Sequence, residues 1–281
     1  MTYFLDFRAN DVGGPVVGPY LYEGDGTAAN LNLTLVPYQQ IAQVVAGRDL
    51  LLATHGFNVS RRHGACSLGL LDQYLNLGPA GLVIAMLWPG DSWLPIVDYP
   101  IEGNVAVDCG TRLADFCNQY CLGANSISFF SHSLGARFVL EAIMHLVPDV
   151  RVVCLTAGAI NRDCLVAEYA RAAGKCRQIA VLASHRDDVL KVAFTVGDPL
   201  ANLLHPDHTP FQAALGYDGP PPLNPQPVAR PWQIPDVLDF THDSYLPPNQ
   251  PGVPPAPGGK WQAVADFAKR GFLLQPQVWP A

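Results

Sequence analysis

The chain has 281 residues, 49% of them hydrophobic and 15% charged, which is enough apolar material for a large buried core. Its formal net charge of −7, with acids and bases interspersed, argues against a nucleic-acid partner, because such a partner requires a basic face. No run approaches the roughly 18 apolar residues of a transmembrane helix, and the N-terminus lacks the pattern of a signal peptide. We therefore expect a cytoplasmic globular protein, with a secreted mature form as the alternative.

Seven cysteines are present, an odd number in a long chain, and this does not indicate a disulfide scaffold. Cys117 and Cys121 are spaced to share one face of a helix, but no C-x-x-C or H-E-x-x-H pair supplies further metal ligands. We expect buried thiols, no metal site and no organic cofactor.

The first 45 residues, in which Leu31 to Val36 alternate, predict antiparallel edge strands. Continuous apolar runs follow, typical of strands buried on both faces of a parallel sheet; they are Leu50–Thr54, Leu82–Leu87, Ile127–Phe130, Val150–Thr156 and Gln178–Ala183. Helical patterns alternate with them near residues 64–77, 103–122, 134–147, 161–173 and 188–196. This rhythm predicts an α/β fold with a doubly wound, mostly parallel sheet and helices on both faces.

Residues 197–258 break this rhythm. Between Pro220 and Pro257 lie 13 of the 26 prolines, too many for central strands or helices. Two interpretations of this long excursion stay open: a lid or substrate-binding loop, and a surface decoration without a role in binding. Trp261 to Phe272 then predicts an amphipathic closing helix. We expect residues 1–281 to form a single domain.

The stretch Ser131-His132-Ser133-Leu134-Gly135 joins an apolar strand to a helical pattern. A serine between small residues at such a turn is typical of a nucleophile elbow, where strand and helix nearly touch. Gly135 is the small residue on one side, and Ser131 replaces the usual glycine on the other. We expect Ser133 to be a nucleophile.

A serine nucleophile needs a base to take its proton, usually a histidine that a carboxylate orients. Asp187 follows the strand that ends at Ala183, and His242 lies in the loop before the last helix. Serine, acid and histidine thus follow one another in an established triad order. Asp187 is expected to be the acid, with Asp188 as the alternative, although an acid at a helix N-terminus also interacts favourably with the helix dipole.

The turn His55-Gly56-Phe57-Asn58 follows an early strand. The tetrahedral intermediate of acyl transfer carries negative charge on an oxygen, and backbone N–H groups must already face that oxygen. Because Gly56 allows a close backbone approach, we expect an oxyanion hole formed by the N–H groups of Phe57 and of Leu134, the residue after Ser133. His55 and Asn58 are expected to shape the turn.

With these motifs the chain resembles the α/β-hydrolase superfamily from about Leu50 to Leu246. It is most similar to a bacterial branch with an H-G-[FY]-N turn and a Trp-Pro pair after the next strand, here Trp88-Pro89. That branch also has a loop with an acid and a tyrosine before a helix, like Asp98-Tyr99. The resemblance implies serine-hydrolase chemistry carried by the serine, acid and histidine named above.

We expect the hydrolysis of carboxylic esters through an acyl-serine intermediate, with a small-molecule ester as substrate. The aromatic residues predicted to line its pocket are Trp88, Trp93, Tyr99 and Trp232. Two alternatives are kept: a lipase or polyester hydrolase with the proline-rich region as its lid, and a catalytically silent binding protein on the same fold. Amide cleavage, acyl transfer and the oligomeric state stay open.

Overall fold

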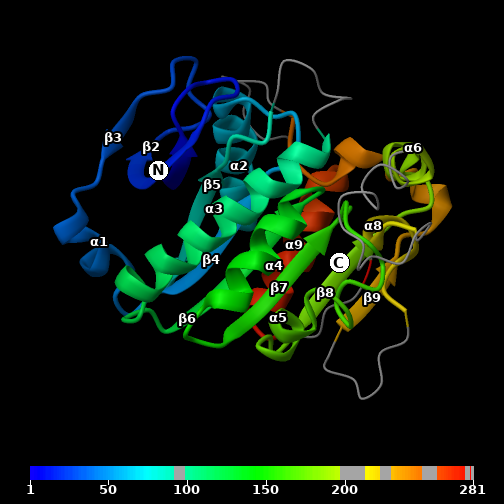
Figure 1. Cartoon of the computed structure of the whole chain (residues 1–281). Helices are drawn as coiled ribbons and strands as arrows, with labels where there is room; N and C mark the ends of the chain where they lie inside the picture. Colours follow the sequence, from blue (N-terminus) through cyan, green and yellow to red (C-terminus); the bar gives the residue numbers. More distant parts are fainter. Residues whose placement is uncertain (92–98, 197–212, 222–228, 249–257, 276–278, 280–281) are drawn as a thin grey trace.

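The computed structural model of the chain describes residues 1–91, 99–196, 213–221, 229–248, 258–275 and 279. The strands in these segments are β1 (Thr2–Arg8), β2 (Val16–Gly24), β3 (Leu33–Leu35), β4 (Asp49–Thr54), β5 (Gly81–Leu87), β6 (Ser126–His132), β7 (Val150–Thr156), β8 (Ile179–Ala183) and β9 (Ala229–Gln233). They form one sheet in the order β3-β2-β1-β5-β4-β6-β7-β8-β9 (Figure 1).

Most of this sheet is parallel. β2 is antiparallel to both β1 and β3, and every other pair of neighbours is parallel. The predicted apolar runs coincide with β4 to β8, whose residues are nearly all buried because helices cover both faces. The predicted antiparallel strands of the first 45 residues are also confirmed. The chain therefore has the fold expected of an α/β hydrolase.

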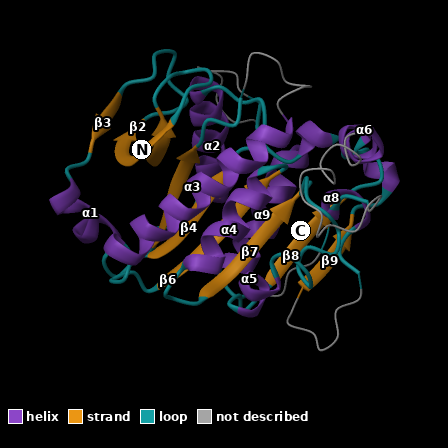
Figure 2. Cartoon of the chain, in the orientation of Figure 1, coloured by secondary structure: helices purple, strands orange, loops and turns teal. Residues whose placement is uncertain are grey.

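The helices are α1 (Tyr38–Val45), α2 (Arg61–Leu75), α3 (Tyr99–Tyr120), α4 (Gly135–His145), α5 (Ala170–Gly174), α6 (Asp188–Val196), α8 (Leu215–Asp218) and α9 (Gly259–Phe272). In the view of Figure 2, α3, α4 and α5 lie in front of the sheet, while α2 and α9 pack together behind it. None of these described helices combines the length and apolarity needed to cross a bilayer.

Two helix predictions need correction. The helix expected over 161–173 shrinks to α5, because Asn161 forms an isolated bridge with Ala214 and the chain up to Tyr169 is held in successive turns. The α1 helix lies inside a stretch where only strands were expected. Its buried side chains, Ile41 and Val45, are four residues apart, which is the spacing of one helix face.

The proline-rich stretch contributes β9 at the edge of the sheet, where a proline such as Pro231 removes no central ladder bond. It also contributes α8 and two short 3-10 turns, η1 (Asp236–Leu238) and η2 (His242–Ser244). The proposed lid falls largely on 197–212, 222–228 and 249–257, which lie outside the described residues.

The parallel strands end at one common edge, which is where ligands bind in open α/β sheets. The loops after β4, β6, β8 and β9 meet at this edge, next to α6 and α8 (Figure 1). All seven cysteines lie in described segments; they are buried, and none is joined in a disulfide.

Candidate active site

Ser133 occupies the sharp turn between β6 and α4 with a left-handed backbone, φ 55°. Non-glycine residues adopt this conformation only where the surrounding structure enforces it, commonly at functional sites. Here the Ser133 N–H donates to the Thr156 carbonyl at 3.0 Å, and the Ser133 carbonyl accepts from the Ala159 N–H at 3.1 Å. The end of β7 therefore holds the strained turn in place.

The two small neighbours of this turn differ in their surroundings. A Cβ added at Gly135 would lie 2.6 Å from the His55 carbonyl oxygen and 2.7 Å from Thr54 Cγ2, so only glycine fits between α4 and β4. Ser131 lies fully buried within β6, and its hydroxyl has no hydrogen-bond partner in the described part of the chain. The elbow thus tolerates serine in place of glycine, with a buried and unsatisfied hydroxyl.

His242 begins the turn η2, which a reciprocal capping box between Thr241 and Ser244 stabilises. Its Nε2 lies 2.9 Å from Ser133 Oγ, and its Nδ1 lies 2.8 Å from Asp187 Oδ2. A carboxylate can only accept, so Nδ1 carries the ring proton and Nε2 presents its lone pair to the serine hydroxyl. This is the arrangement in which an imidazole can take the serine proton.

Asp187 is fully buried at the start of α6 and serves two partners. One carboxylate oxygen faces His242, and the other accepts the Leu190 N–H at 3.0 Å, in the manner of a helix N-cap. Asp188, the sequence alternative, is the first residue of α6 and is exposed. The structure therefore brings Asp187, and not Asp188, to the histidine.

A second contact ties the loop of Asp187 to the loop of His242. Ser184 Oγ, at the end of β8, donates to the Phe240 carbonyl at 2.7 Å and accepts the Arg186 N–H at 3.1 Å. Ser184 is fully buried, so this link is protected from water. It fixes the distance between the acid and the histidine through the backbone.

The predicted oxyanion turn lies directly against Ser133. A Cβ added at Gly56 would lie 2.7 Å from Ser133 Cβ, so glycine is required for this approach. Phe57 follows Gly56, and Leu134 begins the turn into α4, where the first N–H groups of a helix have no partner within the helix itself. Leu134 is thus the residue after the serine, and Phe57 is the residue after the glycine that packs against the serine.

His132, the residue before the serine, contacts both neighbouring loops. Its Nε2 lies 2.9 Å from the His242 carbonyl oxygen, and its ring centroid is 4.8 Å from that of His242. Its Nδ1 faces Gly56, where an added Cβ would come within 3.1 Å. Burial, reinforced by the nearby His242, lowers the pKa of His132 to about 3, so the ring stays neutral.

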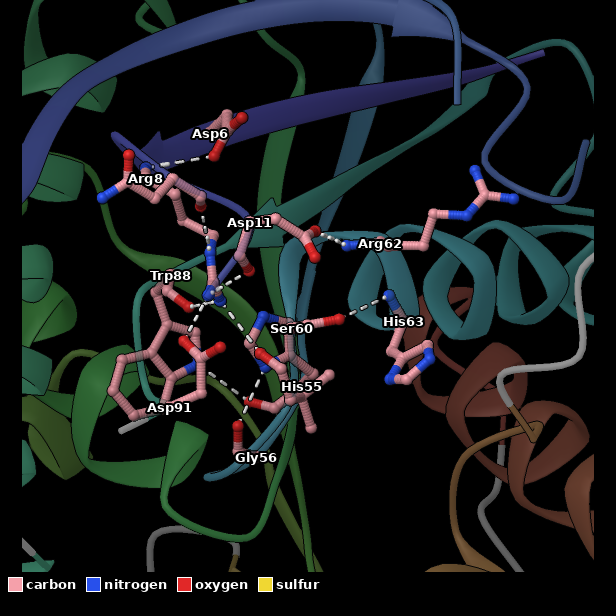
Figure 3. A network of polar contacts seen from close by, with 12 residues as sticks. Asp6, Arg8, Asp11, His55, Gly56, Ser60, Arg62, His63, Trp88 and Asp91 are labelled. Atoms are coloured by element: carbon pink, nitrogen blue, oxygen red, sulfur yellow. Dashed lines mark hydrogen bonds and ion pairs between the residues drawn. The ribbon is translucent and has the colours of Figure 1, made fainter. Parts of the chain in front are cut away.

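His55 contacts the backbone of its own turn, residues 55–58. Its Nδ1 faces the Gly56 carbonyl at 2.8 Å, and its ring stacks on Trp88, whose Nε1–H donates to the His55 carbonyl at 3.1 Å. Complete burial, together with the charge of Arg8, lowers the pKa of His55 to about 3. Figure 3 shows these side chains and the polar network that joins them to Arg8 and Asp91.

A comparison with protein families matches residues 39–244 to a family described as "Alpha/beta hydrolase of unknown function (DUF900)". The chain belongs to this family. The matched segment includes Ser133, Asp187 and His242 and leaves out β1 with Arg8. No curated protein matches the chain.

The predicted pocket residues of this family member fall into different places. Trp88 is fully buried, and its ring contacts those of His55 and Phe138. Trp232 packs edge-on against Phe267 of α9. Trp93 and the side chain of Tyr99 lie outside the described residues. Among the described residues, no group of three or more His, Cys, Asp or Glu is arranged to hold a metal ion.

Sequence reasoning missed two residues that the structure places at this site. His132 stands in the elbow motif itself, but its contact with His242 joins positions 110 residues apart and leaves no local signal. Arg8 ends the first strand, where a charged residue is ordinarily exposed to solvent. The apolar residues before it in β1 are the one available hint that its surroundings are buried.

Proposed function

We propose that this α/β hydrolase is a serine hydrolase that cleaves carboxylic esters through an acyl-serine intermediate. The observation that carries the proposal is the continuous hydrogen-bonded chain from Ser133 Oγ through the His242 ring to the buried Asp187 carboxylate, with distances of 2.9 and 2.8 Å. Side chains from three separate loops meet in this chain, in the order of nucleophile, base and acid that the chemistry requires.

In the first half of the reaction, His242 Nε2 takes the proton from Ser133 as its oxygen attacks the ester carbonyl. Asp187 stabilises the imidazolium that forms, and it stays ionised throughout. The Phe57 and Leu134 N–H groups receive the negative oxygen of the tetrahedral intermediate. His242 then gives its proton to the leaving alkoxide, and the acyl group remains on Ser133.

In the second half, water replaces the alcohol beside His242 and attacks the acyl-serine in the same way, releasing the acid. Esters are the proposed class because an alkoxide leaves readily once a single histidine protonates it, whereas an amide nitrogen is a poorer leaving group. The strained φ of Ser133 supports a fixed attack geometry, because it directs the side chain out of the strand toward His242.

The test is turnover of nitrophenyl esters of increasing acyl length by the wild type and by Ser133→Ala. Removing the nucleophile is expected to lower kcat at least about 1,000-fold, leaving only what binding and the oxyanion hole contribute. Ser128→Ala is the matched control: this serine is also buried, it lies in β6, the strand that leads to Ser133, and its hydroxyl has no hydrogen-bond partner in the described part of the chain. Its variant is expected to keep wild-type activity.

A fluorophosphonate probe gives an independent readout, since it should label Ser133 in the wild type and in Ser128→Ala but not in Ser133→Ala. Equal turnover by Ser133→Ala and the wild type would refute the assignment. Absence of both turnover and labelling in the wild type would favour a silent binding protein on this fold.

A further inference from the structure

Arg8 lies at the end of β1, and its charged side chain is fully buried. A guanidinium has five N–H donors in a fixed fork, and five acceptors surround this one. They are the carbonyl oxygens of Asn10 (3.3 Å), Val59 (2.9 Å), Trp88 (2.8 Å) and Asp11 (2.7 Å) and the carboxylate of Asp91. Every donor thus has an acceptor, and the acceptors come from three different loops (Figure 3).

Stability alone is a weak reason for this arrangement. Taking a guanidinium and a carboxylate out of water is unfavourable, and apolar residues of the same volume often stabilise a core as well or better. Asp91 even retains one buried oxygen, Oδ2, with no hydrogen-bond partner in the described part of the chain. What the buried pair does provide is a defined geometry for the loops around it.

Those loops include the oxyanion turn. Arg8 holds it at the Val59 carbonyl, the Trp88 indole N–H holds it at the His55 carbonyl, and the Asn58 N–H donates to the Gly90 carbonyl at 2.6 Å. These three contacts lie on both sides of Phe57, the proposed oxyanion donor. Arg8 also binds the Trp88 carbonyl, so it fixes the two loops against each other.

Small movements of this turn reach the nucleophile, because Gly56 packs against Ser133 with no room for a methyl group. A donor displaced by about 1 Å can lower a rate about 100-fold. We infer that Arg8 and Trp88 are positioning residues of the oxyanion hole. Arg8 lies on β1, outside the segment that matches the family. The inference rests on the proposed function. Arg8 binds no substrate atom itself.

Lysine cannot replace Arg8 in this role. An ammonium group has three donors on one atom, whereas these acceptors are spread along a planar fork and belong to separate loops. Arg8→Lys keeps the charge beside Asp91 and releases at least two of the backbone contacts. It therefore separates the electrostatic role of Arg8 from its positioning role.

The experiment compares ester turnover by the wild type, Arg8→Lys and Trp88→Phe. Arg8→Lys is expected to lower kcat by about 100-fold. KM and the shape of the pH–rate profile should stay unchanged, because the contacts of His242 are untouched. Trp88→Phe keeps the ring stack on His55 and loses one hydrogen bond, so its kcat should fall about fivefold.

Arg61→Gln is the matched control. Arg61 forms an ion pair with Asp6, which lies on the same strand as Arg8, and in the described part of the chain its side chain makes no hydrogen bond or ion pair with residues 55–59. The control should lose stability and keep the wild-type kcat. An equal loss of melting temperature in Arg8→Lys and Arg61→Gln, without a loss of kcat in the former, would show a purely structural role and overturn the inference.

A second readout separates this inference from the proposed function. Hydrogen exchange of the Asn58 amide, which donates to Gly90, should be at least tenfold faster in Arg8→Lys and unchanged in Arg61→Gln, whether or not the protein cleaves esters. Unchanged exchange in Arg8→Lys overturns the positioning role. If Arg8→Lys does not fold, Trp88→Phe decides, and an unchanged kcat in that variant rejects the inference.

Discussion

His132 Nε2 donates to the carbonyl oxygen of His242 across 2.9 Å, so the residue before the proposed nucleophile holds the backbone of the proposed base. Because a carbonyl only accepts, the His132 proton must lie on Nε2, and the unprotonated Nδ1 is turned toward Gly56. A neutral ring at this point connects the base with the oxyanion turn and adds no positive charge beside an imidazolium.

This relationship predicts the effect of His132→Ala. Loss of the donor frees the His242 backbone, and we expect kcat to fall about tenfold, the change associated with one lost hydrogen bond of average strength. KM should be unaffected, because the contacts that His132 makes are with other residues of the protein and not with substrate. His132→Gln, which keeps an N–H donor, should recover most of the lost kcat; recovery no better than in the alanine variant would contradict the prediction.

The buried His132 also predicts a pH dependence of stability. Its pKa is about 3 in the folded protein and close to the ordinary 6.5 in the unfolded chain. Between these values the unfolded chain binds a proton that the folded protein does not, so the contribution of this ring to the free energy of unfolding falls as the pH drops below 6.5. Above pH 6.5 the ring is neutral in both states and contributes no slope.

Urea denaturation of the wild type and His132→Gln at pH 7.5 and pH 5 measures this effect. Each pH unit below 6.5 corresponds to about 1.4 kcal/mol, so the wild type should lose about 2 kcal/mol more than the variant between the two conditions. Other titrating groups cancel in the difference between the two proteins. Equal losses would show that His132 takes up its proton in the folded state.

The sheet could be predicted from the sequence because its central strands are buried on both faces. That burial leaves continuous apolar runs such as Val150–Thr156, which coincides with β7. The expected helix over 161–173 failed because a long-range bridge between Asn161 and Ala214 decides the local backbone, and no periodicity within the segment reports it.

The candidate site shows the same division. The order of serine, acid and histidine can be predicted from the sequence. The choice between Asp187 and Asp188 cannot, because a shift of one residue at the start of α6 exchanges a buried carboxylate for an exposed one. The contacts of Arg8 with Val59 and Trp88 join β1 to loops more than 50 residues away, so they cannot be predicted from the spacing of residues in the sequence.

Gly56→Ala tests the approach of the oxyanion turn to the nucleophile. The new methyl group would lie 2.7 Å from Ser133 Cβ and 3.1 Å from His132 Nδ1, so the turn must move away. We expect kcat to fall about 100-fold. Gly174→Ala in α5, where the new Cβ would have no described residue outside its own helix turn within 4 Å, should leave kcat unchanged. Full activity of Gly56→Ala would mean that the turn does not carry an oxyanion donor.

Ser131→Ala tests the unusual residue of the elbow. Its buried hydroxyl has no hydrogen-bond partner in the described part of the chain, so removing it should raise the free energy of unfolding by about 1 kcal/mol. Ser126→Ala in the same strand should do the opposite, because that hydroxyl donates to Asp49 at 2.7 Å. Urea denaturation checks both signs, and a destabilised Ser131→Ala would show that the hydroxyl is hydrogen-bonded after all.

Asp187→Asn against Asp188→Asn decides which carboxylate orients the base. An amide facing His242 Nδ1 can donate as well as accept, so the ring can place its proton on Nε2, where it blocks transfer from Ser133. We expect kcat to fall about 10,000-fold in Asp187→Asn, with little change in KM. Asp188 is exposed, and the hydrogen bond to the histidine comes from Asp187, so Asp188→Asn should stay within about twofold of the wild type, the range of a neutral surface change. Comparable losses in the two variants would mean that the acid acts through the start of α6 as a whole, and a loss confined to Asp188→Asn would transfer the role to that residue.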